Sequence, residues 1–216
     1  MPVHHPDDSL LMEYAAGSVS EARALLVATH LALCPACRAA VRDGEVVGGV
    51  LLRDSAYHVG AGDPREPGMP FAAQPKPTAA LASSPVPNPL RDYLARPLAE
   101  LSWVPVWRGM SEYKLPQFAH GVRLLSIPAG HRMPRHTHGG EELTLVLQGS
   151  FADATGHYAK GDVATADASI NHQPEAGSGD TCLCLAVEDG ALRLTGWAGQ
   201  LLTAASFVRD LARRKS

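Results

Sequence analysis

The sequence predicts a two-domain protein, with an N-terminal all-α domain followed by a C-terminal all-β domain. Residues 8 to about 54 are rich in alanine and leucine and carry helix-capping residues. Residues 60–89 contain eight prolines, which exclude regular helix and central strand and predict a linker. From about residue 98 onward, short apolar stretches recur between glycines, a pattern typical of a β-sandwich or barrel.

Capping residues divide the N-terminal part into three helices. Gly17 is a C-terminal stop for the first helix, and Ser18 with Glu21 forms a capping-box pattern that predicts a second helix from Ser18 to about residue 33. Pro35 suits the first turn of a third helix. We expect that helix to bend or break, because glycine is a poor helix former and the helix contains three: Gly44, Gly48 and Gly49.

Four apolar stretches predict the strands of the second domain. They read VRLLSIPAG (122–130), ELTLVLQGSF (142–151), DVATA (162–166) and TCLCLAVEDG (181–190). Their length and spacing favour short strands over helices. A final helix is predicted at about residues 204–214.

Composition excludes several classes of protein. The net charge of −3 gives no reason to expect direct nucleic-acid binding. No apolar run reaches the ~18 residues that a membrane helix needs, and the N-terminus lacks the basic region of a signal peptide. A cytoplasmic location is therefore predicted. In that reducing compartment, the paired cysteines at 34/37 and 182/184 favour metal or redox chemistry over disulfides.

A first cluster of metal-ligand residues lies between the second and third helices. His30 and Cys34 are four residues apart and share one helix face, and Cys37 follows one turn later. Zinc favours four nitrogen and sulfur ligands, so a fourth is expected from His4 or His5. The alternatives are two cysteines buried as small apolar residues, or a redox pair, although no strand precedes this C-x-x-C.

A second cluster lies in the β-domain and comprises three histidines and one carboxylate. His136 and His138 are two residues apart on a strand, so both side chains face the interior. Glu142 and His172, from later strands, are expected to converge on them. This set suits a divalent metal, zinc first, with iron, manganese, nickel and copper left open. The alternative is that these histidines are merely packed or exposed.

The first cluster resembles a known family. H-x3-C-x2-C, with a histidine about 25 residues upstream, is similar to the zinc-binding anti-sigma domain family. The resemblance covers residues 1–85, which contain most of the linker at 60–89, and selects His5 over His4 to complete a closed structural zinc site of His5, His30, Cys34 and Cys37. It implies a four-helix domain that clamps a sigma factor.

The second cluster resembles the cupin family. The motif G-x5-H-x-H-x3-E-x6-G is matched by Gly130, His136, His138, Glu142 and Gly149. In the second cupin motif Gly161 and His172 are in register, while three expected residues are replaced, by Asp167, Ser169 and Ala176. The resemblance implies a double-stranded β-helix, or jelly-roll barrel, at residues 90–216 including the terminal helix.

Together the two resemblances predict an anti-sigma factor rather than an enzyme. They imply a 1:1 complex with an extracytoplasmic-function sigma factor of the RpoE type, and release when the cupin senses singlet oxygen or organic peroxides. Apolar helix residues would be shared between the domain's own core and the sigma factor: Leu10, Leu11, Tyr14, Leu25, Leu26 and Val27. The alternative is a metal-dependent cupin dioxygenase or isomerase with a regulatory zinc domain.

Overall fold

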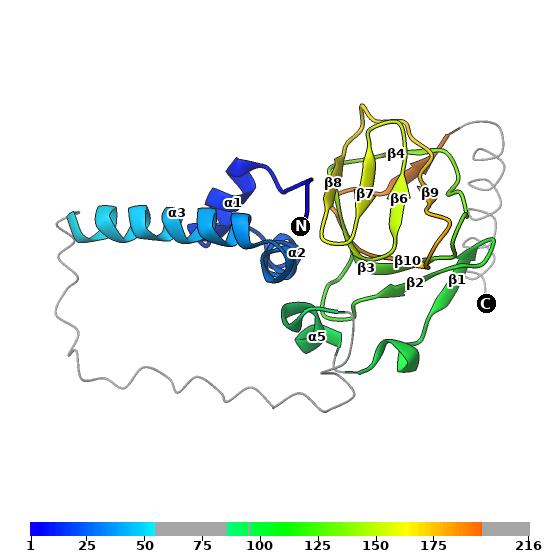
Figure 1. The fold of residues 1–216 in the computed structure, drawn as a ribbon, viewed down its shortest axis with the longest axis horizontal. Coiled ribbons are helices and arrows are strands. Elements are labelled where there is room, and N and C mark those ends of the chain that lie inside the picture. The colour runs from blue at the N-terminus through cyan, green and yellow to red at the C-terminus, as the bar shows by residue number, and fades with distance from the viewer. Residues whose placement is uncertain (55–85, 95, 196–216) are drawn as a thin grey trace, which may run out of the picture.

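The computed structural model describes residues 1–54, 86–94 and 96–195, and Figure 1 shows a helical part beside a β-sandwich. Most of the predicted 60–89 linker and the whole predicted helix at 204–214 lie outside these residues. The division into an N-terminal helical region and a C-terminal β-rich region is as predicted. Among the described residues, no helix is long and apolar enough to cross a membrane.

Three helices form the N-terminal part. They are α1 (Asp8–Ala15), α2 (Glu21–Leu33) and α3 (Pro35–Asp54). Asp7 caps α1 by accepting a hydrogen bond from the Leu10 N–H. The predicted start of α2 at Ser18 is wrong by three residues, because Ser20 caps the helix through the Arg23 N–H.

The expected break in α3 does not occur, since the helix runs unbroken through its three glycines. Gly44 explains part of this. A Cβ at Gly44 would lie 3.0 Å from the Met12 sulfur and 3.2 Å from the Ala15 Cβ, both on α1. Glycine there lets α1 pack closely on α3, which offsets its low helix propensity.

Eleven described strands form the β-sandwich, and each of the four predicted stretches contains one. A six-stranded antiparallel sheet has the order β1 (Val104–Trp107), β2 (Met110–Lys114), β3 (Val122–Ile127), β10 (Cys182–Glu188), β5 (Glu142–Gln148) and β8 (Val163–Ala166). Two smaller sheets pair β11 (Leu192–Leu194) with β4 (His136–His138), and β6 (Ser150–Ala152) with both β7 (His157–Ala159) and β9 (Glu175–Ala176). The described strands do not form the single closed barrel that was predicted.

A short helix, α5 (Asn88–Leu94), precedes the sheet, followed by a 3₁₀ turn at Leu98–Glu100. The prediction that prolines exclude helix as far as residue 89 is wrong at this end. Pro89 occupies the first turn of α5, where a helix does not use the backbone N–H that proline lacks.

The central strands β5 and β10 of the six-stranded sheet are buried on both faces. On β10, Leu183, Leu185 and Val187 belong to the core shared with the helices. The intervening Cys182 and Cys184 belong to a second core inside the sandwich. Burial on both faces explains why this strand reads as a continuous apolar run instead of an alternating one.

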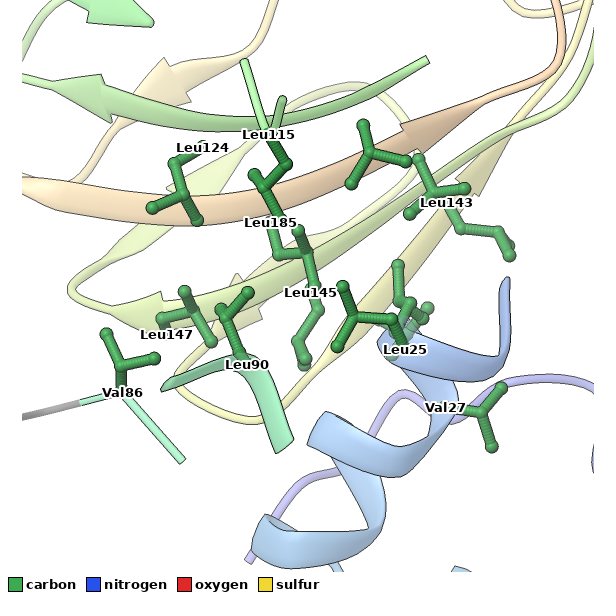
Figure 2. Packing of buried hydrophobic residues seen from close by; sticks show 14 of the residues in the cluster. Leu25, Val27, Val86, Leu90, Leu115, Leu124, Leu143, Leu145, Leu147 and Leu185 are labelled. Atoms are coloured by element: carbon green, nitrogen blue, oxygen red, sulfur yellow. The ribbon is translucent and has the colours of Figure 1, made fainter. Parts of the chain in front are cut away.

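Helices and sheet share one continuous hydrophobic core. Figure 2 shows Leu25 of α2 and Leu90 of α5 packed against Leu145 and Leu185 of the sheet. All four side chains are at most 3 % exposed. The helical part is thus held against the outer face of the sheet by apolar burial, the dominant favourable term in such packing.

Candidate metal centres

The structure brings the four residues of the first cluster together. His5 comes from the N-terminal segment, His30 from the last turn of α2, Cys34 from the cap of that helix and Cys37 from the first turn of α3. One ligand atom from each lies within 4.8 Å of the others. The His5 Nδ1 is 3.5 Å from the Cys34 sulfur and 3.3 Å from the Cys37 sulfur. All but His5 are buried.

The neighbouring His4 points elsewhere. Its ring packs on Tyr158 of the β-sandwich, with 4.6 Å between the ring centroids. His5 is therefore the upstream histidine whose ring reaches the two thiols.

The donor set of this cluster fits zinc. The Nδ1 of His30 donates to the Gly161 carbonyl at 2.8 Å, which leaves a lone pair on Nε2. That Nε2 is buried and has no hydrogen-bond partner among the described residues. A buried polar atom without a partner is costly, and a cation among two sulfurs and two nitrogens would satisfy it.

The thiols also lack a compensating charge. Burial, and then the hydrogen bond with Cys34, raises the pKa of the Cys37 thiol to about 12. Burial likewise lowers the pKa of His30, which keeps its imidazole neutral. Zinc requires a neutral imidazole and a thiolate, and its own charge would stabilise the thiolate that this site otherwise disfavours.

The second cluster is formed by three histidines of the β-sandwich. His136 and His138 lie on β4, and a backbone bridge pairs His136 with His172. The Nε2 of His172 lies 3.0 Å from the Nε2 atoms of both His136 and His138. The sandwich thus directs three imidazole nitrogens at one point, and all three residues are at most 8 % exposed.

The tautomers of His136 and His172 are fixed by the hydrogen bonds that their Nδ1 atoms make. The His136 Nδ1 donates to the Pro134 carbonyl at 2.7 Å, and the His172 Nδ1 donates to the Asp153 carboxylate at 2.5 Å. Both Nε2 atoms therefore carry lone pairs that face each other. Facing lone pairs repel unless a cation lies between them, so the geometry fits a bound divalent metal.

Glu142 lies beside this cluster rather than at its centre. Its Oε2 is 2.7 Å from the Nδ1 of His138, although the geometry does not give that nitrogen a hydrogen bond. Burial favours a raised pKa for Glu142, but His138 and Arg123 outweigh it and lower the pKa overall. The carboxylate therefore stays charged next to the three imidazoles.

A small cavity of about 40 Å³ adjoins the second cluster. His136, Glu142 and His172 line one side, and the remaining wall is mainly apolar, including Phe151 and Cys184. A cavity of this size has room for roughly one or two water-sized molecules.

The remaining histidines and cysteines of the β-sandwich lie outside both clusters. His120, His131 and His157 are exposed. Cys182 and Cys184 are free and buried, with their sulfurs 3.5 Å apart. The hydrogen bond with Cys182, together with burial, raises the pKa of the Cys184 thiol, so it stays protonated. Asp153 was not identified from the sequence, because no sequence motif marks a residue that accepts a hydrogen bond from the Nδ1 of a candidate histidine ligand.

Acidification should destabilise the metal-free protein. Burial lowers the pKa of His136 to about 4, from an ordinary value of 6.5. As the pH falls, the unfolded chain therefore binds a proton at His136 before the folded protein does. The contribution of His136 to the free energy of unfolding is complete above about pH 6.5 and is lost as the pH falls toward 4. Between about pH 7 and 5 we expect a loss on the order of 2 kcal/mol, measurable by urea unfolding. His136→Gln should remove this part of the pH dependence, and an unchanged dependence in that variant would contradict the assignment.

These features define a class of protein: a helical region with a zinc-ligand cluster, joined to a cupin-like β-sandwich with a histidine cluster. Comparisons with known proteins agree. Residues 8–38 match a zinc-finger family, and residues 93–192 match the ChrR cupin-like domain family.

The full chain is similar to the anti-sigma-E factor ChrR of Cereibacter sphaeroides. The two are 40 % identical over 203 residues, which cover 92 % of this chain and 95 % of that protein. The crystal structure of Rhodobacter sphaeroides SigE in complex with the anti-sigma ChrR matches with a TM-score of 0.72 and 38 % identity, over 88 % of this chain and 100 % of that one. An RmlC-like cupin protein from Ralstonia eutropha matches 47 % of this chain and 71 % of its own at 25 % identity, with a TM-score of 0.39.

The chain belongs to the ChrR family of anti-sigma factors. It is an anti-sigma factor homologue and not an enzyme, so the alternative of a cupin dioxygenase or isomerase is set aside.

Proposed function

We propose that this protein binds an extracytoplasmic-function sigma factor of the SigE type in a 1:1 complex and sequesters it from RNA polymerase. The similarity to ChrR over almost its whole length supports this function. The observation that carries it on this chain is an exposed apolar stripe on α3, beyond the zinc-ligand cluster.

The stripe consists of Val46, Val47, Val50 and Leu51, whose side chains are 61, 59, 42 and 66 % exposed. Their spacing places them on one face of the helix. By contrast, the helix residues that the sequence suggested are largely in the core: Leu10, Leu11, Leu25, Leu26 and Val27 are at most 4 % exposed. Among the described helices, the C-terminal half of α3 therefore carries the main group of exposed apolar residues that a partner could contact. An amphipathic helix that lays such a stripe in a partner's groove is a recurrent recognition mode.

In this function the first cluster holds a structural zinc ion through His5, His30, Cys34 and Cys37. The zinc fixes the junction of α2 and α3 and so sets the direction of the stripe. Four protein ligands leave no position for water, as in structural zinc sites. The second cluster holds a divalent metal through His136, His138 and His172, with Glu142 as a further ligand or as the charged partner of His138.

The domain limits that go with this function are residues 1–85 for the anti-sigma domain and 90–216 for the cupin domain. The cupin is the sensing half. Oxidants such as singlet oxygen or organic peroxides would act there and release the sigma factor. The cavity of about 40 Å³ beside the metal centre supports this part, because it places open space next to His136 and His172, where a small oxidant could reach them.

Placing charge in the stripe tests the function. Val47→Asp combined with Leu51→Asp should weaken binding of a SigE-type sigma factor by at least roughly 100-fold, because each buried carboxylate would lack a partner. Binding can be measured by titration calorimetry with the purified sigma factor. Glu45→Ala, on the opposite face of the same helix, is the matched control and should bind like the parent chain. If the double variant and the control bind the sigma factor with equal affinity, the proposed docking face is wrong.

A further inference from the structure

The zinc-ligand cluster of the helical region is in direct contact with the turn between β7 and β8 of the cupin. Asp162, only 2 % exposed, is the last residue of this turn before β8. One carboxylate oxygen accepts the backbone N–H of Val3 at 2.6 Å and that of His4 at 3.0 Å. The other accepts the N–H of Ala159 at 2.8 Å. The Val163 N–H donates in turn to the His4 carbonyl at 3.1 Å. The backbone immediately before His5 is therefore attached to the cupin.

The adjacent Gly161 holds the second histidine of the cluster. Its carbonyl accepts the Nδ1–H of His30, at 2.8 Å, across the boundary between the two regions. Gly161 has φ of +94°, and a Cβ there would lie 2.6 Å from the Pro2 side chain. Only glycine fits both the backbone conformation and this close approach. The hydrogen bond fixes the tautomer of His30, so that its Nε2 faces the two thiols.

We propose that Asp162 and the Gly161 carbonyl are positioning groups for the zinc site, so that the cupin orients two of the four zinc ligands. Asp162 orients His5 through the backbone of residues 3 and 4, and Gly161 orients His30 through its outer nitrogen. Hydrogen bonds of this kind hold a ligand ring in place before the metal arrives, and losing one typically costs 10–100-fold in metal affinity. The proposal rests on the zinc assignment made above.

The stretch of chain that leads into this turn also contacts the second cluster. Asp153, in the turn between β6 and β7, accepts a hydrogen bond from His172. Thr155 and Tyr158 are joined through their hydroxyls at 3.0 Å, and the Tyr158 ring packs on His4. One stretch of the cupin, residues 153–163, is thus in contact with a histidine of the cupin cluster and with the segment that carries His5.

Cobalt substitution of the full chain tests the proposal. Cobalt bound by thiolates gives a charge-transfer absorption, and the described histidine cluster holds no sulfur, so this band reports on the first site alone. The rate at which the band decays in excess chelator measures metal release. Asp162→Ala should speed release by about 10–100-fold and shift the cobalt d–d bands, because the ligands lose their orientation. Asp162→Asn should be intermediate, since it keeps one acceptor oxygen. Asp180→Asn, an exposed carboxylate of the same domain, is the control.

A second variant covers the case in which Asp162→Ala fails to fold. Val3→Pro removes one N–H donor to Asp162 from the exposed N-terminal side and changes no core residue. It should speed release in the same direction by a smaller factor. Parent-like release and parent-like d–d bands in the folded variants would overturn the proposal. A parent chain with no cobalt–thiolate band would instead overturn the zinc assignment, whatever Asp162 does.

Discussion

Cys37→Ala should abolish stable zinc binding by the N-terminal region and, with it, binding of the sigma factor. The three helices span 8, 13 and 20 residues, and α3 has one buried apolar residue beyond its zinc-ligand turn, Val41. In small zinc domains metal binding contributes about 10–16 kcal/mol toward folding, so loss of one of four ligands removes a large part of that stabilisation. We expect zinc affinity to fall by at least about 100-fold and the stripe on α3 to lose its fixed direction.

Zinc affinity can be measured by competition with a chromophoric chelator, and sigma-factor affinity by calorimetry on the same samples. Cys182→Ala is the matched control, because it removes an equally buried thiol that lies outside both clusters. This control should keep the N-terminal zinc and the sigma factor. A Cys37→Ala chain that lost zinc yet bound sigma normally would show that the metal does not support the docking face.

Local rules predicted the helices and the clusters well, because both depend on short spacings. Pro35 begins α3 as expected, and His30, Cys34 and Cys37 meet because a helix turn and its cap place them within reach. The error at Ser18 has the same origin: two serines, Ser18 and Ser20, both precede the acidic start of the helix, and the side chain of Ser20 is the one that caps it. Boundary residues are where such local signals compete.

The docking of the helices onto the sheet could not be read from spacing. Leu25, Leu145 and Leu185 are far apart in sequence, and any of them would suit the core of its own domain. The only hint was that β10 reads as a continuous apolar run, which indicates burial on both faces without saying what covers them. Likewise, no pattern in the neighbouring sequence identifies Asp162 as the residue that accepts hydrogen bonds from the N-terminal segment.

The position of Glu142 shows a further limit. Motif register placed it with the histidines, and it does line the same cavity as His136 and His172. Yet its carboxylate faces the Nδ1 of His138, on the opposite edge of that ring from the converging Nε2 atom. A motif fixes which residues gather, whereas the rotamer of each side chain depends on packing that the motif does not describe.

His172→Ala should empty the cupin centre while leaving the N-terminal zinc in place. Its Nε2 is the atom that contacts both other imidazoles, so its loss leaves two facing nitrogens and one carboxylate beside His138. Metal affinity at this centre should fall by at least about 100-fold, since loss of an outer-shell partner alone costs 10–100-fold. Elemental analysis of dialysed protein should then give one metal per chain, against two for the parent. His157→Ala, an exposed histidine of the same sandwich, should keep two.

The same variant separates binding from sensing. Because the stripe on α3 and the N-terminal zinc are untouched, His172→Ala should still bind the sigma factor when no oxidant is present. If the cupin metal is the sensor, an organic peroxide that dissociates the parent complex should leave the variant complex intact. Dissociation of both complexes at equal rates would place the oxidant's target outside the cupin centre. The two thiols of the N-terminal cluster would then be the next site to test, since cysteine sulfur is the group there that peroxides oxidise.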